Sequence, residues 1–182
     1  MFCLKLFNKN IFCLYRHFIM SLNIEKSCSV KKSNSLLVEK ISLDNYKQCI
    51  FGSFPISFMR NYLKEQSDYA KGFLLKNTDG LCVGYIWVML KGGCEVQYKI
   101  KNIDAFIFDV CVNKDFRRNG IGSYMISYVV NYLFERNKKK CFLAVRRDNE
   151  PAINLYKKNG FNFVKACSFI RVCKRNIPYY SL

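Results

Sequence analysis

Apolar and polar positions along this chain form blocks that predict a series of short strands and helices. Runs with the length and β-branched or aromatic content of strands cover residues 36–41, 72–76, 81–90, 105–112, 142–145 and 161–174, and residues 95–100 prolong the meander. Helical spacing of apolar residues covers 56–64 and 123–134, and a short helix is expected from Asn149 to Gly160. We expect Ser42 or Asp44 to cap a further helix. In this order, the elements predict an α/β (α+β) chain with helices on both faces of a mixed sheet.

A glycine-containing loop separates the strand at 105–112 from the helix at 123–134. Its sequence is Arg117-Arg118-Asn119-Gly120-Ile121-Gly122. Two glycines one residue apart leave little side-chain bulk, so backbone N–H groups can approach a polyphosphate at the start of a helix, where the helix dipole favours anions. A P-loop would continue with Lys and then Ser or Thr, but Ser123 and Tyr124 follow here; a dinucleotide fingerprint would have a third glycine in place of Met125. We interpret the loop as a site for another pyrophosphate.

The remaining pattern, Arg-x-x-Gly-x-Gly after a strand, resembles the acetyl-coenzyme A loop of the GNAT N-acetyltransferases. The family's other landmarks stand in order on either side of it: the strand 107–112, the strand 142–145, Asn149, Tyr156 and the pair Gly160-Phe161. The resemblance covers roughly residues 103–164. It implies the GNAT fold, a mixed and mostly antiparallel twisted sheet with helices on both faces and a splayed central strand pair.

The resemblance also implies acetyl-CoA as cosubstrate and a set of binding residues. The lack of histidine in the motif region argues against a metal. The backbone of Cys111 and Val112 would bind the pantetheine arm. Asn149, which by pattern alone would be a helix cap, would contact the pantetheine amide. Tyr156, by periodicity a core aromatic, would lie near the thioester sulfur and protonate the leaving thiolate, since a phenol keeps its proton at neutral pH. The pyrophosphate would be bound by Arg117, Arg118, Asn119, Gly120, Ile121, Gly122 and Ser123.

The general base is the least certain member of the site by sequence. Many GNAT enzymes have Glu on the strand before the loop or, in protein amino-terminal acetyltransferases, on the next strand, but this chain has Phe106, Phe108 and Ala144 there. Asp109 is the acidic residue that we favour, and Glu95 and Asp104 are alternatives. A covalent intermediate on Cys111 is disfavoured because the chain's single histidine, His17, lies outside the motif region.

The composition limits the number of domains and the cellular environment that fit this interpretation. The 182 residues fit one domain, over residues 36–182, and 51% hydrophobic content excludes disorder for most of it. We expect residues 1–35 to be a flexible basic and apolar leader, or an over-long gene start with Met20 as the alternative beginning. Its apolar stretch is interrupted by charges, so no membrane span is expected. The ten cysteines are scattered without a C-x-x-C pair, which favours reduced thiols in a cytoplasmic protein.

Several functions remain open. The net charge of +17 is dispersed, which argues against a nucleic-acid partner. We expect direct acetyl transfer to the primary amine of a small molecule: an amino sugar, a polyamine or an amino acid. The alternatives are a protein acetyltransferase acting on an N-terminus or a lysine, for example of a ribosomal protein, and an acyl-CoA-binding regulator without turnover. A homodimer is compatible with any of these.

Overall fold

The computed structural model describes residues 2–5, 10–25, 35–52, 56–65, 68–91 and 101–174. The strands are β1 (Phe2–Lys5), β2 (Asn10–Asn23), β3 (Leu37–Lys40), β4 (Ala70–Lys76), β5 (Cys82–Met89), β6 (Asp104–Val112), β7 (Lys140–Arg146) and β8 (Asn162–Lys174). The helices are α1 (Ile56–Glu65), α2 (Ile121–Phe134) and α3 (Glu150–Lys158), with the short 3-10 helices η1 (Tyr46–Cys49) and η2 (Lys114–Phe116). None of the helices in these ranges combines the length and hydrophobicity that crossing a bilayer requires.

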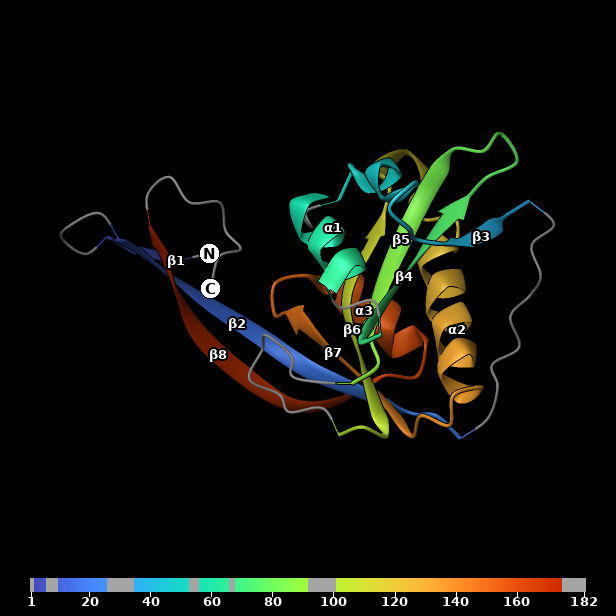
Figure 1. The fold of residues 1–182 in the computed structure, drawn as a ribbon. Coiled ribbons are helices and arrows are strands. Elements are labelled where there is room, and N and C mark those ends of the chain that lie inside the picture. The colour runs from blue at the N-terminus through green and yellow to red at the C-terminus, as the bar shows by residue number, and fades with distance from the viewer. Residues whose placement is uncertain are drawn as a thin grey trace.

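One sheet holds all eight of these strands, in the order β1-β2-β7-β6-β5-β4-β3, with β8 paired to β2 (Figure 1). Of the strand pairs within the described ranges, only β6 and β7 run parallel. The hairpin predicted between β4 and β5 is present, because Asn77 Oδ1 accepts hydrogen bonds from the backbone of Asp79 and Leu81, and Gly80 takes φ 77°. The mixed, mostly antiparallel sheet expected from the sequence is therefore confirmed.

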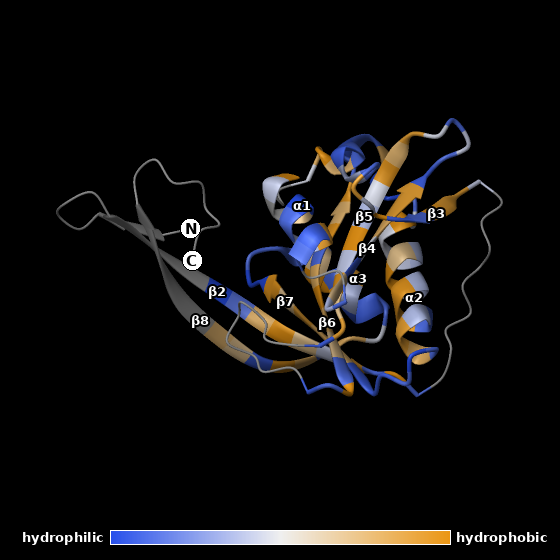
Figure 2. Ribbon diagram, in the orientation of Figure 1, coloured by the Kyte–Doolittle hydropathy of each residue, from blue (hydrophilic) through white to orange (hydrophobic). Residues whose placement is uncertain are grey.

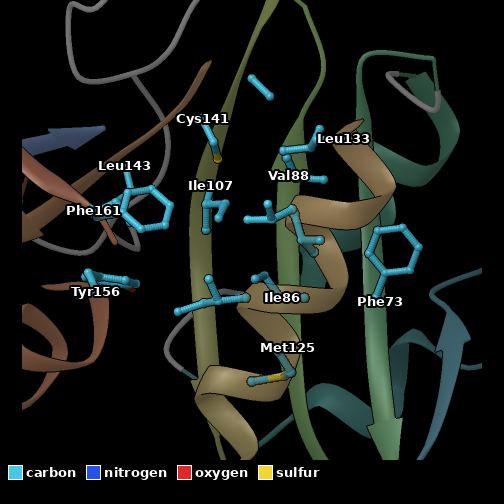
Figure 3. Close-up of a cluster of buried hydrophobic side chains, with 14 of the residues drawn as sticks. Phe73, Ile86, Val88, Ile107, Met125, Leu133, Cys141, Leu143, Tyr156 and Phe161 are labelled. Carbon is cyan, nitrogen blue, oxygen red and sulfur yellow. The ribbon is translucent and has the colours of Figure 1, made fainter. Parts of the chain in front are cut away.

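Helices cover both faces of this sheet. On one face, α2 packs through Met125, Val129 and Leu133, which lie within the helical segment predicted at 123–134, and α3 adds Ile153 and Tyr156. Figure 3 shows these helices and the central strands contributing to one continuous cluster, and Figure 2 shows how strongly hydrophobic β5 and the sheet-facing side of α2 are. On the other face, η1 and α1 bury a second cluster, which includes Tyr46, Cys49, Met59, Tyr62, Tyr85, Trp87 and Phe106.

Two local predictions differ from the structure. The helix after the glycine loop begins at Ile121, earlier than expected, because Gly120 adopts a left-handed φ of 77° and ends the loop there. Neither Ser42 nor Asp44 caps an α-helix: the Ser42 hydroxyl accepts a hydrogen bond from the Asp44 backbone, and the helix that begins at Tyr46 is the short 3-10 helix η1. The expected strand at residues 95–100 lies outside the described residues.

The structure also corrects the prediction for the beginning of the chain. We expected residues 1–35 to be a flexible leader, but β2 lies inside the sheet, paired with β7 from His17↔Arg146 to Asn23↔Lys140 and with β8 along its other edge. Ile19 and Met20 are 0% and 1% exposed and enter opposite core clusters. A strand buried on both faces has no alternation of apolar and polar positions, so its pattern resembles an irregular apolar segment. Residues 26–34 of the expected leader lie outside the described residues.

Candidate active site

The opening between β6 and β7 is the feature around which the site forms. The two strands pair only from Asp104↔Lys140 to Ile107↔Leu143, although both continue further. On its other side β6 stays paired with β5, where Tyr85 faces Cys111 and Gly84 faces Val112. Beyond Ile107, no described strand pairs with the β7-facing side of β6. This is the splayed pair implied by the family resemblance, and it leaves backbone groups of β6 available to an extended ligand.

A short loop leads from the open end of β6 to the start of α2. Asn113 begins it, and its side-chain oxygen accepts a hydrogen bond from the Asp115 backbone, 3.3 Å. The Arg117 side chain turns back and donates from Nε to the carbonyl oxygen of Val112, 3.2 Å. Arg118 has a left-handed φ of 66° and is exposed, as are Asn119 and Gly120. The two arginines therefore directly precede the first turn of α2, with the Arg117 side chain bound to the end of β6.

The first turn of α2 supplies backbone N–H groups rather than side chains. Ile121 is buried in the core and Gly122 is buried against α3, so only their backbones are available to a ligand. The first N–H groups of a helix have no acceptor within the helix and favour an anion. The Ser123 hydroxyl accepts a hydrogen bond from the Asn159 side chain, 3.1 Å, which ties the loop to the end of α3.

Helix α3 carries the two further residues of the predicted site. Asn149 is its N-cap, with Oδ1 accepting from the Ala152 backbone at 3.3 Å, so the capping role that the pattern suggested is present. The cap uses Oδ1 only and does not engage the side-chain NH₂ group. Tyr156 is 8% exposed and packs edge-on against Phe161 with ring centroids 6.0 Å apart. Burial, reinforced by the neighbouring Asp109 carboxylate, raises the pKa of Tyr156 above its usual range, so the phenol stays protonated at neutral pH.

Asp109 lies on β6 just past the last residue paired with β7. The register with β5 shifts there, because Trp87 pairs with Asp109 while Val88 pairs with Ile107, which leaves Phe108 as the extra residue of a bulge. Phe108 stacks on Tyr62 of α1, with ring centroids 5.3 Å apart. Bulges often redirect side chains beside active sites. This one accompanies the point where β6 leaves β7.

The Asp109 carboxyl has the protonation behaviour of a base near neutral pH. Burial raises its pKa to about 6, against the opposing effects of the Tyr85 hydroxyl and the Val110 backbone N–H. Its Oδ2 atom is buried with no hydrogen-bond partner among the described residues. Because Asp109 in turn raises the pKa of Tyr156, the two residues lie within electrostatic reach of each other across the opening. The carboxyl of the candidate base thus acts electrostatically on the phenol of the candidate acid.

The other candidates contribute less. Asp104 is buried at the closed end of the strand pair, opposite Lys140, and Glu95 lies outside the described residues. Burial and Asp109 raise the pKa of Cys111, which disfavours a nucleophilic thiolate. Within the described part of the chain, no group of His, Cys, Asp and Glu side chains is arranged to hold a metal ion. Tyr85, which the sequence analysis did not single out, is a diagonal neighbour of Asp109 across the β5–β6 pair, and its hydroxyl lowers the pKa of Asp109. No sequence motif marks that arrangement.

Comparisons with known proteins agree with this geometry. The chain matches the family described as Acetyltransferase (GNAT) family over residues 40–161. It is 33% identical over 116 residues to an N-alpha-acetyltransferase of Sulfurisphaera tokodaii, covering 62% of this chain and 68% of that protein. It is 34% identical over 59 residues to the [Ribosomal protein bS18]-alanine N-acetyltransferase of Escherichia coli, covering 32% of this chain and 40% of that protein.

Solved structures share the fold at low sequence identity. A GCN5-related N-acetyltransferase from Sphaerobacter thermophilus superimposes with a TM-score of 0.66 and 15% identity, over 90% of this chain and 53% of that one. Ard1 from Thermoplasma volcanium gives a TM-score of 0.58 and 20% identity, over 76% of this chain and 97% of that one. The chain thus spans about half the length of the Sphaerobacter protein and nearly all of the Thermoplasma one.

Proposed function

We infer the reaction of this chain from its membership of the acetyltransferase (GNAT) family, which makes it an N-acetyltransferase. We propose that it acetylates the α-amino group of a protein N-terminus directly from acetyl-CoA. The observation that carries the chemistry is the open end of β6, where the buried Asp109 carboxyl, with a pKa of about 6, lies beyond the last residue paired with β7 and acts electrostatically on the protonated Tyr156 phenol. The observation that favours the acceptor is the likeness to an N-alpha-acetyltransferase at 33% identity.

Acetyl-CoA fits the residues at the opening. Its pyrophosphate is placed at the start of α2, against the N–H groups of Gly120, Ile121, Gly122 and Ser123, with Arg117, Arg118 and Asn119 beside it. Its pantetheine arm runs along β6 at Cys111 and Val112 as an added strand and meets the side-chain NH₂ group of Asn149. This brings the thioester toward Tyr156 and Asp109.

The reaction then proceeds by direct transfer. Above pH 6 the Asp109 carboxylate accepts a proton from the acceptor ammonium, and the free nitrogen attacks the thioester carbonyl. A backbone N–H of the open part of β6 stabilises the oxyanion. As the C–N bond forms and the C–S bond breaks, Tyr156 gives its proton to the departing thiolate. The acylated nitrogen gives its second proton through solvent to the Tyr156 phenolate, and Asp109 releases its proton to solvent, so that the ammonium and acetyl-CoA yield the amide, the CoA thiol and one proton.

A small primary amine is the second candidate acceptor. Ala144 occupies the position on β7 where many protein amino-terminal acetyltransferases have Glu, so β7 offers no carboxylate there. The aromatic side chains of Tyr62, Trp87 and Phe108 lie close together near Asp109 and favour a compact acceptor. Free thiols among the described cysteines support a cytoplasmic location for either reaction; they are Cys49, Cys82, Cys111, Cys141 and Cys167.

A panel of acceptors with release of free CoA thiol as readout tests the proposal. Peptides with a free N-terminal Ala, Ser or Met, the same peptides blocked at the N-terminus but carrying Lys, and spermidine, glucosamine and free amino acids are compared at equal concentration. We expect the free-N-terminus peptides to react fastest and their blocked forms to be inert. A small amine that reacts faster supports the second candidate. Acetyl-CoA binding without turnover on any member would contradict both and favour the non-catalytic regulator.

A further inference from the structure

Two buried oxygen atoms near the opening each lack a hydrogen-bond partner among the described residues: Tyr85 Oη and Asp109 Oδ2. Tyr85 is 0% exposed, on a strand whose every residue is buried. A buried polar atom without a partner costs free energy, so such atoms are rare and call for an explanation. Each of these two supplies what the other lacks, since the hydroxyl needs an acceptor and the carboxylate oxygen needs a donor.

The sheet register places the two side chains next to each other. Tyr85 pairs with Cys111 and Trp87 pairs with Asp109, so Tyr85 and Asp109 are diagonal neighbours on adjacent strands. Both face the side of the sheet that η1 and α1 cover, where Tyr85 belongs to the cluster around Trp87. Their influence on each other is reciprocal: the hydroxyl lowers the pKa of Asp109, and Asp109 raises the pKa of Tyr85.

The segment after η1 restricts where the Tyr85 hydroxyl can go. A β-carbon at Gly52 would lie 1.7 Å from Tyr85 Oη, so the glycine backbone lies directly against the hydroxyl. The Phe51 ring packs on the Tyr85 ring with centroids 5.5 Å apart. Only glycine leaves space for the hydroxyl at this point, so the backbone of Gly52 limits where the phenol can move.

We propose that Tyr85 is a positioning residue for acetyl transfer: its hydroxyl donates to the Asp109 carboxylate and holds that carboxylate toward the acceptor nitrogen. The inference rests on the proposed role of Asp109 and adds the residue that orients it. Gly52 belongs to the same arrangement, because it confines the hydroxyl. Tyr85 is thereby distinguished from the other buried tyrosines of its cluster, Tyr46 and Tyr62, which do not contribute to the pKa of Asp109.

The groups that face Asp109 come from several elements. They are Tyr85 from β5, Cys111 and the Val110 N–H from β6, Cys49 from η1 and Tyr156 from α3. Within the described residues, Tyr85 is the only side chain among them that lowers the pKa of Asp109. Removal of its hydroxyl must therefore raise that pKa, whereas a loss of packing alone would not.

Carbon-13 NMR titration of the Asp109 carboxyl in the full chain tests the proposal without any acceptor. Asp109→Asn assigns the resonance. We expect a midpoint near pH 6 in the parent chain and a rise of about half a pH unit or more in Tyr85→Phe. Tyr46→Phe is the matched control, being the same chemical change at a buried tyrosine of the same cluster, and should leave the midpoint in place. An unmoved midpoint in folded Tyr85→Phe overturns the proposal.

Two further measurements decide the matter if Tyr85→Phe does not fold. Gly52→Ala should push the hydroxyl aside and raise the Asp109 midpoint in the same direction. In the unchanged protein, the Cζ resonance of Tyr85 should titrate with the Asp109 midpoint, and a flat response there overturns the proposal. Because these titrations need no turnover, they remain informative even if the acceptor panel shows no acetylation, which would contradict the proposed function alone.

Discussion

Leu155 of α3 lies so close to Gly122 of α2 that a β-carbon at position 122 would stand 2.9 Å from its Cδ2 atom. With the hydrogen bond from Asn159 to Ser123, this contact fixes the start of α2 against the helix that carries Asn149 and Tyr156. The part of the chain proposed to bind pyrophosphate and the part proposed to protonate the thiolate are therefore held as one unit.

Gly122→Ala should separate the two helices. The added methyl group overlaps Leu155, and overpacking of this kind typically costs about 1–3 kcal/mol of unfolding free energy. Urea denaturation measures the loss. In a Leu155→Ala background the methyl group has room, so the cost of Gly122→Ala should shrink markedly. Equal costs in both backgrounds would contradict the contact.

Gly120→Glu should weaken acetyl-CoA binding at least tenfold, or about 1.4 kcal/mol, because it places a carboxylate at the proposed pyrophosphate site. Gly80→Glu is a matched control: Gly80 has the same φ of 77° and the same open space around its would-be β-carbon, but lies in the hairpin turn. Calorimetry compares the two. If both variants bind acetyl-CoA equally well, the loop is not the pyrophosphate site.

Tyr156→Phe should lower turnover and leave acetyl-CoA affinity nearly unchanged, since it removes a proton donor and little volume. Turnover at saturating substrates and the dissociation constant are measured side by side, with Tyr46→Phe as a control for loss of a buried hydroxyl. Undiminished turnover, with chemistry shown to be rate-limiting, would leave Tyr156 a core aromatic only.

Asp109→Asn should stabilise the folded protein and at the same time impair its acetyltransferase activity. The folded-state pKa of Asp109 is raised to about 6, so its contribution to stability is fully present below about pH 4 and is lost as pH rises through 6. Above pH 6 the variant should therefore unfold at a higher temperature than the parent, and the difference should vanish near pH 4.

The activity of the parent should fall on the acid side with a midpoint near pH 6. The Asp109→Asn variant should show a raised Michaelis constant for the amine, lowered turnover, or both. A variant that is fully active on a free-N-terminus peptide that the parent acetylates excludes Asp109 as the base.

Removal of residues 1–19 should greatly destabilise the protein, the reverse of what a flexible leader implies. The deletion takes most of β2, including buried Ile19, and exposes the edges of both β7 and β8. Removal of residues 1–9 is the control, because it takes only β1, which pairs with β2 alone. Thermal unfolding of the two shortened chains is compared; similar melting temperatures would show that β2 is dispensable.

The pattern of apolar and polar residues predicted most of the helices, strands and turns, because each of them depends on residues that are close in sequence. The 123–134 helix, the Asn77 to Gly80 hairpin and the Asn149 cap each depend on residues close in sequence, and each is present. The splayed strand pair was implied by family resemblance rather than by pattern, and the register of β6 and β7 confirms it. The roles of the site residues remain predictions.

What the pattern missed depends on contacts between distant segments. Nothing near Ile19 in the sequence indicates that strands from the far end of the chain lie on both sides of it. Similarly, the diagonal placement of Tyr85 and Asp109 on adjacent strands depends on a bulge at Phe108, which is a property of the register between β5 and β6. Propensity along one segment cannot specify how two segments align.

The position of β2 has a consequence for synthesis of the protein. It leaves the ribosome well before its partners β7 and β8 are translated. Pairings across such a distance close slowly, because the intervening chain must first be brought together. An apolar strand that waits for its partners is exposed to association with other nascent chains, so the yield of folded protein should depend on how quickly translation finishes and on chaperones that cover the strand until then.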